Sequence, residues 1–153
     1  MNRFRRFFPL AVAGVFLSCS LSASAFAAEY VSVKKDGVNI RTGPSAENPV
    51  VMEVFRGFPL QVLETKGKWL RVVDYEKDSG WISKDMTDTS KTVIVISKSS
   101  ANMRQEANTK SPKVADVESG VVLQLISKKG DWRQVKHSGG TSGWIHQELV
   151  WPQ

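Results

Sequence analysis

Cysteine and histidine are almost missing from this sequence of 153 residues, which contains only Cys19, His137 and His146. One cysteine cannot form a disulfide within the chain, and two dispersed histidines without a nearby cysteine do not make a zinc site. A cysteine nucleophile paired with histidine is excluded as well, and nothing suggests a frame for a serine nucleophile. We therefore expect no metal, no cofactor and no enzyme activity, and a fold stabilised by packing alone.

A hydrophobic run long enough to cross a bilayer is also lacking. Apolar residues continue for only eleven positions, 7–17, whereas a membrane helix needs about 20. The run follows three arginines and precedes small residues, which is the arrangement of a secretory signal. We predict that residues 1–27 are a signal peptide cleaved after Ala27, so that the mature protein is periplasmic or extracellular and has no stable membrane span. A lipid anchor on Cys19 is the alternative, although the residues before it match that pattern poorly.

Acidic residues are scarce in the second half of the mature chain. Residues 29–90 carry 9 basic and 10 acidic side chains, whereas residues 91–153 carry 9 and 5. This excess has two interpretations, a solvated surface or attraction to an anionic surface such as cell-wall polymer or lipid headgroups. We expect no nucleic-acid partner.

The sequence repeats itself after sixty-three positions without a gap, from about residue 30 to residue 150. The repeated residues cluster at turn and motif positions: Asn39, Arg41, Pro49, Gly57, Leu60, Gly67, Trp69, Val72, Gly80, Trp81 and Ile82 match Asn102, Arg104, Pro112, Gly120, Leu123, Gly130, Trp132, Val135, Gly143, Trp144 and Ile145. A duplication explains this pattern, and each copy is large enough for a very small domain. We place the first domain at residues 29–88 and the second at residues 92–153.

Short apolar segments separated by turn signals predict β-strands, and no stretch has sustained helical periodicity. In the first copy we expect five strands, at about residues 30–34, 51–55, 60–65, 69–73 and 80–82. Five short strands are typical of a small closed barrel, because closure removes exposed edges. Single helical turns are expected at residues 83–86 and 146–149.

The spacing of the repeated tryptophans separates them from the repeated aliphatic residues. In a regular strand, residues one or three apart lie on opposite faces, so Trp69 opposes Val72 and Trp81 opposes Ile82. The same holds for Trp132 and Trp144 in the second copy. If the aliphatic side chains fill the barrels, the tryptophans lie outside them.

The combination Val38-Asn39-Ile40-Arg41-x-Gly43-Pro44-Ser45, Gly67-x-Trp69-x-x-Val72 and Gly80-Trp81-Ile82 resembles the bacterial SH3 (SH3b) domain family, and the second copy resembles it too. The resemblance implies an all-β fold of two tandem five-stranded SH3-like barrels. It also implies a binding module of the cell envelope, of the kind found beside peptidoglycan-active enzymes. The second copy departs from the pattern at residues 105–108, where the first has Thr42-Gly43-Pro44-Ser45.

We expect binding to peptidoglycan or its stem peptides, with a protein-protein adaptor in the periplasm as the alternative. The candidate ligand-binding residues are Arg41, Trp69, Tyr75, Trp81, Arg104, Trp132 and Trp144, and the candidate structural residues are Asn39, Gly57, Gly80, Asn102, Gly120 and Gly143. Structural roles stay open for the first group. The tryptophans can instead pack the barrels together, and each Arg can fork its donors onto backbone carbonyls.

Overall fold

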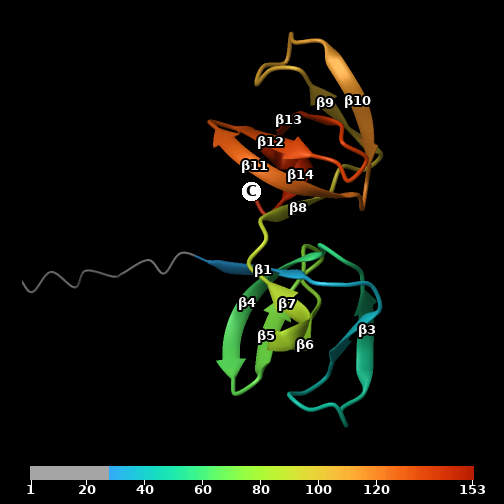
Figure 1. Cartoon of the computed structure of the whole chain (residues 1–153), viewed down its shortest axis with the longest axis vertical. Coiled ribbons are helices and arrows are strands. Elements are labelled where there is room, and N and C mark those ends of the chain that lie inside the picture. The colour runs from blue at the N-terminus through green and yellow to red at the C-terminus, as the bar shows by residue number, and fades with distance from the viewer. Residues whose placement is uncertain (1–27) are drawn as a thin grey trace, which may run out of the picture.

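A computed structural model describes residues 28–153, so the expected signal peptide lies outside the described residues. The chain forms two β-sheet bodies, one from each copy, joined through a short linker before β8 (Figure 1). The first body contains β1 (Glu29–Val33), β2 (Val38–Arg41), β3 (Val50–Val54), β4 (Pro59–Lys66), β5 (Trp69–Val73), β6 (Ser79–Ser83), the 3-10 helix η1 (Lys84–Met86) and β7 (Thr87–Asp88). The second contains β8 (Thr92–Val95), β9 (Ser100–Arg104), β10 (Lys113–Glu118), β11 (Val122–Lys129), β12 (Trp132–Lys136), β13 (Ser142–His146), η2 (Gln147–Leu149) and β14 (Val150–Trp151).

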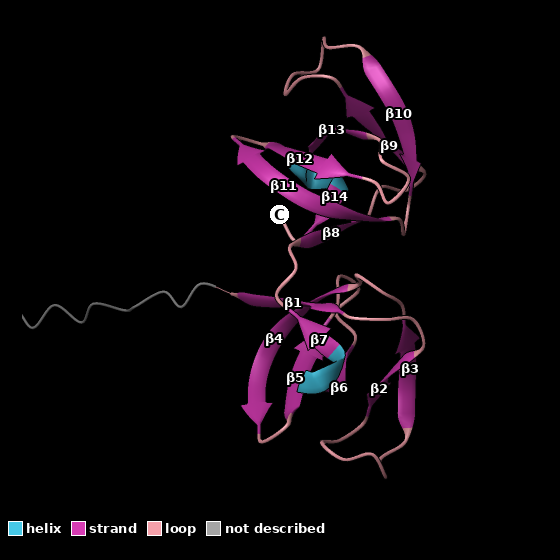
Figure 2. Cartoon of the chain, viewed as in Figure 1, coloured by secondary structure: helices cyan, strands magenta, loops and turns pink. Residues whose placement is uncertain are grey.

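The all-β class and the duplication are confirmed, but each sheet has seven strands rather than five. The strand order is β3-β2-β6-β5-β4-β1-β7 in the first sheet, and the second sheet repeats it. The five predicted strands are present, and the two single helical turns appear as the short helices of Figure 2. The prediction missed β2, whose Val38 and Ile40 are buried between polar neighbours. It also missed β7, which has two residues and is held by pairing with β1.

The repeated aliphatic residues fill the two barrels. The first core contains Val31, Val33, Val38, Ile40, Val54, Phe58, Leu60, Leu70, Val72 and Ile82, and the second contains Val93, Val95, Ala101, Met103, Val117, Leu123, Val135, Ile145 and Val150. None of the four repeated tryptophans belongs to either cluster as described, and all four are half-buried. The alternation predicted from the spacing is therefore confirmed.

The barrels touch through β1 and β8. Ile94 of β8 is 1% exposed and belongs to the first barrel's core cluster, although its neighbour Val93 belongs to the second. The Thr92 hydroxyl donates to the Gly57 carbonyl at 2.7 Å and lies 2.6 Å from the Ser32 hydroxyl. Trp151 meets the Tyr30 ring edge-on at 5.5 Å between ring centres. The tryptophan at this contact is thus Trp151 and not one of the four repeated ones.

One buried position carries a charged residue in one barrel and an apolar residue in the other. Arg133, 6% exposed, stands where the sixty-three-residue shift places Leu70. Its guanidinium donates to the carbonyls of Gly130 and Trp132 and to the side chain of Gln147, while its Nε has no partner. None of these partners is a carboxylate. Burial, and then the charges of Arg133 and Lys91, lower the pKa of Lys128, which faces Arg133 across the strands.

This comparison predicts that Arg133→Leu is tolerated and Arg133→Ala is not. Leucine restores the residue of the first barrel and removes a buried charge, and such replacements are often neutral or stabilising, so we expect a change within about 1 kcal/mol. Both variants remove the donors to the oxygens that Arg133 bonds, but alanine also leaves a void, which costs about 2 kcal/mol more. Urea denaturation measures both variants. A leucine variant more than about 2 kcal/mol less stable than the unchanged protein would show that the guanidinium bonds stabilise the barrel.

Candidate functional site

A groove on the first barrel brings two of the candidate binding residues together. It has a volume of about 370 Å³ and is lined by Lys35, Gly37, Val38, Asn39, Arg41, Ala46, Trp69, Ser83 and Met86. Asn39 and Arg41 come from β2, Trp69 from the start of β5, and Met86 from η1. The groove therefore offers one flat aromatic face, one amide and two cationic groups.

The repeated arginines fix the loop that follows them. Arg41 donates from Nη1 to the Asn48 carbonyl, and Arg104 donates in the same way to the Ser111 carbonyl, each at 2.8 Å. These bonds are the contacts to backbone carbonyls that the sequence analysis gave as the structural alternative to ligand binding. A guanidinium has five N–H donors, so the remaining ones stay available to a ligand in the groove.

The loops that differ between the copies have the same backbone. Thr42 and Gln105 each donate their N–H to the carbonyl of the proline seven residues on, at 3.0 Å. Ser45 and Asn108 likewise each donate to the carbonyl two residues before them. The sequence difference therefore changes the side chains that the loop presents and leaves its path unchanged.

Trp81 and Trp144 lie beside the repeated arginines on the outer faces of the sheets. Trp81 is the cross-strand partner of Arg41 on one side and of Arg71 on the other. Trp144 pairs with Arg104 and with Gln134. Neither tryptophan lines the Trp69 groove, so the structure does not bring all the candidate residues into one site.

The corresponding region of the second barrel is filled differently. Ser83, which lines the groove of the first barrel, corresponds to His146 in the second. The His146 ring packs edge-on against Trp132 at 5.4 Å between ring centres, and its Nδ1 lies 3.6 Å from a Glu148 carboxylate oxygen. An imidazole therefore covers part of the indole surface that stays open in the first barrel.

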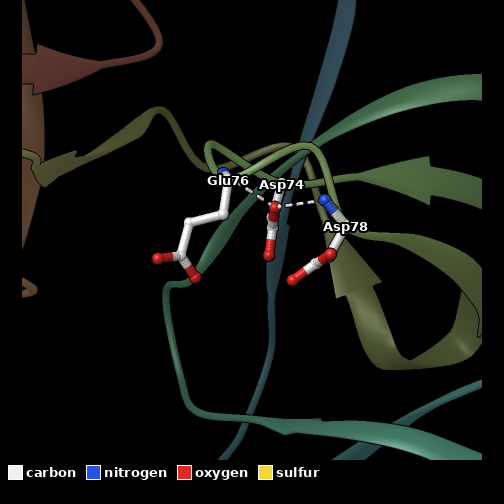
Figure 3. A group of neighbouring side chains, drawn as sticks. All are labelled: Asp74, Glu76 and Asp78. Atoms are coloured by element: carbon white, nitrogen blue, oxygen red, sulfur yellow. Dashed lines mark hydrogen bonds between the residues drawn. The ribbon is translucent and has the colours of Figure 1, made fainter.

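Asp74, Glu76 and Asp78 gather in the hairpin loop between β5 and β6 (Figure 3), an arrangement that the sequence did not predict. Their ligand atoms lie within 4.8 Å of one another. The Asp74 side chain is 2% exposed, however, and its Oδ1 already accepts the backbone N–H groups of Glu76 and Asp78 at 2.9 and 3.0 Å. The trio is thus explained by the loop, which Asp74 holds in shape.

The second barrel makes the same loop without a carboxylate. His137 corresponds to Asp74, and its Nδ1 accepts the Gly139 N–H at 3.0 Å. Because an imidazole accepts the backbone N–H in place of the carboxylate, a cation is not needed to form the turn.

Tyr75 lies in the loop between β5 and β6 of the first barrel and points toward Phe58, at 6.2 Å between ring centres. It lies outside the groove. Its pKa is raised by burial and then by the charges of Glu76 and Asp74.

The candidate structural glycines have two different geometries. Gly57 and Gly120 have φ of +81° and +83°, a conformation that other residues rarely adopt. Gly80 and Gly143 instead lie where strands approach closely. A Cβ on Gly143 would meet the Arg104 carbonyl at 2.7 Å, and one on Gly80 would meet the Arg41 carbonyl at 2.9 Å.

The sequence did not single out the groove residues Lys35, Ala46, Ser83 and Met86. These come from a turn, a loop and the end of β6 with η1, so only the folded chain brings them beside Trp69. Lys35 does have a lysine at the same place in the second copy, Lys98, which was an available signal.

The family model described as "Bacterial SH3 domain" matches residues 34–88 and again residues 97–152. A curated relative, YrvJ of Bacillus subtilis, is named as an N-acetylmuramoyl-L-alanine amidase and is 22% identical over 95% of this chain, which spans only 30% of YrvJ. Among solved structures, NlpC2 of Trichomonas vaginalis (14% identity, TM-score 0.37) is matched over 83% of this chain and 49% of its own. An NlpC/P60 family protein of Bacillus cereus (14% identity, TM-score 0.38) is matched over 80% and 55%. Within residues 28–153, no helix has the length and hydropathy to cross a membrane. The family matches cover both copies of the repeat, and the chain belongs to the bacterial SH3 domain family.

Proposed function

We propose that this chain is a non-catalytic binding module of the bacterial cell envelope, exported by its N-terminal segment, that recognises peptidoglycan or its stem peptides. The observation that carries the proposal is the groove that places Trp69 beside Asn39 and Arg41. An indole face stacks on a sugar ring, the amide bonds its polar substituents, and the cations of Arg41 and Lys35 attract carboxylates.

The curated relative supports the same ligand class. YrvJ is named for an amide that joins an amino sugar to an amino acid, and this chain aligns with part of it. A glycan that carries short acidic peptides offers both a stacking surface and carboxylates, which are the two features that the groove matches. We propose that the protein acts in the periplasm or outside the cell, and the name of this relative supports a location at the cell envelope.

Retention of the purified chain on isolated cell-wall sacculi tests the proposal. We expect retention at moderate salt and a loss of about tenfold in affinity for Trp69→Ala, because stacked tryptophans dominate binding energies. Trp132→Ala is the matched control, and we expect a smaller effect because His146 already packs against that ring.

Two outcomes would count against the groove. Absence of retention at low salt would remove the peptidoglycan proposal altogether. Retention that vanishes at moderate salt and is unaffected by Trp69→Ala would assign binding to the overall charge of the second half. Salt screens the interaction between exposed charges that are more than about 10 Å apart.

The second candidate is an adaptor that binds another envelope protein, and one observation favours it. β3 lies at the edge of the first sheet, and its Val50 and Val51 are 47% and 51% exposed. An edge strand with exposed apolar side chains can pair with a strand of another protein. Loss of sacculus binding together with retention of a specific envelope protein by this edge would favour the adaptor.

A further inference from the structure

A cleft with a volume of about 800 Å³ lies between the two barrels. Both barrels contribute to its walls, beside the Thr92 contact with Gly57. Its charged residues are mostly cationic. Lys34 and Arg56 come from the first barrel, Lys136 comes from the second, and Asp88 is the one carboxylate of the lining.

Within the described part of the chain, Lys34, Arg56 and Lys136 take part in no ion pair. The ion pairs found there join other residues. Lys34 donates to the Asp85 carbonyl at 3.0 Å, which satisfies a donor and leaves the charge uncompensated. Cations that converge between low-dielectric walls concentrate the positive potential and attract anions into the space.

A partly exposed aromatic ring lies at the same cleft. Phe55 lines the cleft and is 42% exposed, although it meets the Phe58 ring edge-on at 5.4 Å. Phe58 in turn lies against Tyr75, so this contact holds the ring of Phe55 in place. The second copy has Glu118 and Ser119 at the places of Phe55 and Arg56, so the pairing of ring and cation is missing at the corresponding place of that copy.

We propose that this cleft binds an acidic polysaccharide, with a sugar ring against Phe55 and its carboxylates near Lys34, Arg56 and Lys136. The exposed ring favours a sugar over an acidic peptide, because a pyranose presents C–H groups that stack on an aromatic face. The cleft shares no lining residue with the Trp69 groove, so it is a second site and does not depend on the function proposed for that groove.

Calorimetric titration of the whole protein tests this assignment with three probes. Hyaluronan hexasaccharide carries carboxylates on an amino-sugar chain, chitohexaose is its neutral counterpart, and poly-L-glutamate is an acidic peptide. We expect hyaluronan to bind about tenfold more tightly than chitohexaose, because the cations add charge pairing to stacking. We expect Phe55→Ala to weaken the binding of hyaluronan and to leave that of poly-L-glutamate unchanged.

The double variant Lys34→Ser with Arg56→Ser removes two cations from the cleft and introduces the serines that the second copy has at these places. Its matched control, Lys110→Ser with Lys129→Ser, removes the same charge from residues that do not line the cleft. We expect a loss of about tenfold for the first pair and less than twofold for the second.

Equal losses in the two double variants would overturn the proposal, since binding would then follow net charge and not the cleft. Binding of poly-L-glutamate as tight as that of hyaluronan, and independent of Phe55, would assign the cleft to an acidic peptide and also overturn it. Trp69→Ala should leave hyaluronan binding unchanged, so that failure of the cleft is distinguished from failure of the groove.

Discussion

Ile94→Ala is expected to destabilise the first barrel, although the residue belongs to the second. Ile94 is almost fully buried and lies in the cluster that contains Val31 and Leu60. Truncation of a buried isoleucine to alanine removes its transfer free energy and leaves a cavity, so we expect unfolding to become easier by about 3 kcal/mol. Chemical denaturation measures the total, and native-state hydrogen exchange shows where protection is lost.

The neighbouring residue provides the control for this experiment. Val93 is as well buried as Ile94 but belongs only to the core of the second barrel. Val93→Ala should therefore lower protection in the second barrel, for example at Val135, while Ile94→Ala should also lower it at Val33 and Val72. If Ile94→Ala changes exchange in the second barrel alone, the barrels are energetically independent.

Gly80→Ala and Gly143→Ala should each cost about 3 kcal/mol, near the upper end of the range for overpacking. A methyl group on Gly143 would overlap Met103 and the Arg104 carbonyl. At Gly80, it would overlap Ile40 and the Arg41 carbonyl. In each barrel a buried side chain and a backbone oxygen would have to move together, and the strand carrying the repeated arginine would be displaced. Thermal or urea denaturation measures the loss.

Gly67→Asn separates this crowding from the general effect of replacing a glycine. Gly67 has φ of +56° in a hairpin turn, and a Cβ there would meet nothing within 4 Å. Asparagine adopts this conformation more readily than most residues, so we expect a cost below about 1 kcal/mol. If alanine at Gly80 and Gly143 costs no more than asparagine at Gly67, the close approach of the strands does not determine stability.

The repeat made most of the fold predictable, because features that occur twice are visible in one sequence. The spacing of Trp69 and Val72 predicted which side chains enter the barrel, and the glycines marked the turns. The alternation also has an exception. Arg133 lies on the inward face, where its spacing from Val135 places it, but its charge alone would assign it to the surface. Local propensity did not indicate the carbonyls that accept its hydrogen bonds.

The candidate site was less predictable, since its parts meet only through tertiary structure. The sequence indicated Arg41 but not its acceptor, because the loop that carries Asn48 must fold back before the bond can form. It indicated Trp132 but not the ring of His146 against it, a contact that depends on the register of β12 with β13. The sequence also did not indicate which residues form the contact between the barrels, because Ile94 has the spacing of an ordinary core residue.

The contact between the barrels involves matching places on the two copies. Val31 and Ile94 are related by the sixty-three-residue shift, as are Gly57 and Gly120, and both members of each pair lie in or beside the contact. The contacts themselves are not reciprocal, because Ile94 lies in the core of the first barrel while Val31 does not lie in the core of the second. The two copies therefore use the same place on the barrel in different ways. A substitution at one member of a matched pair is not expected to have the effect of the same substitution at the other.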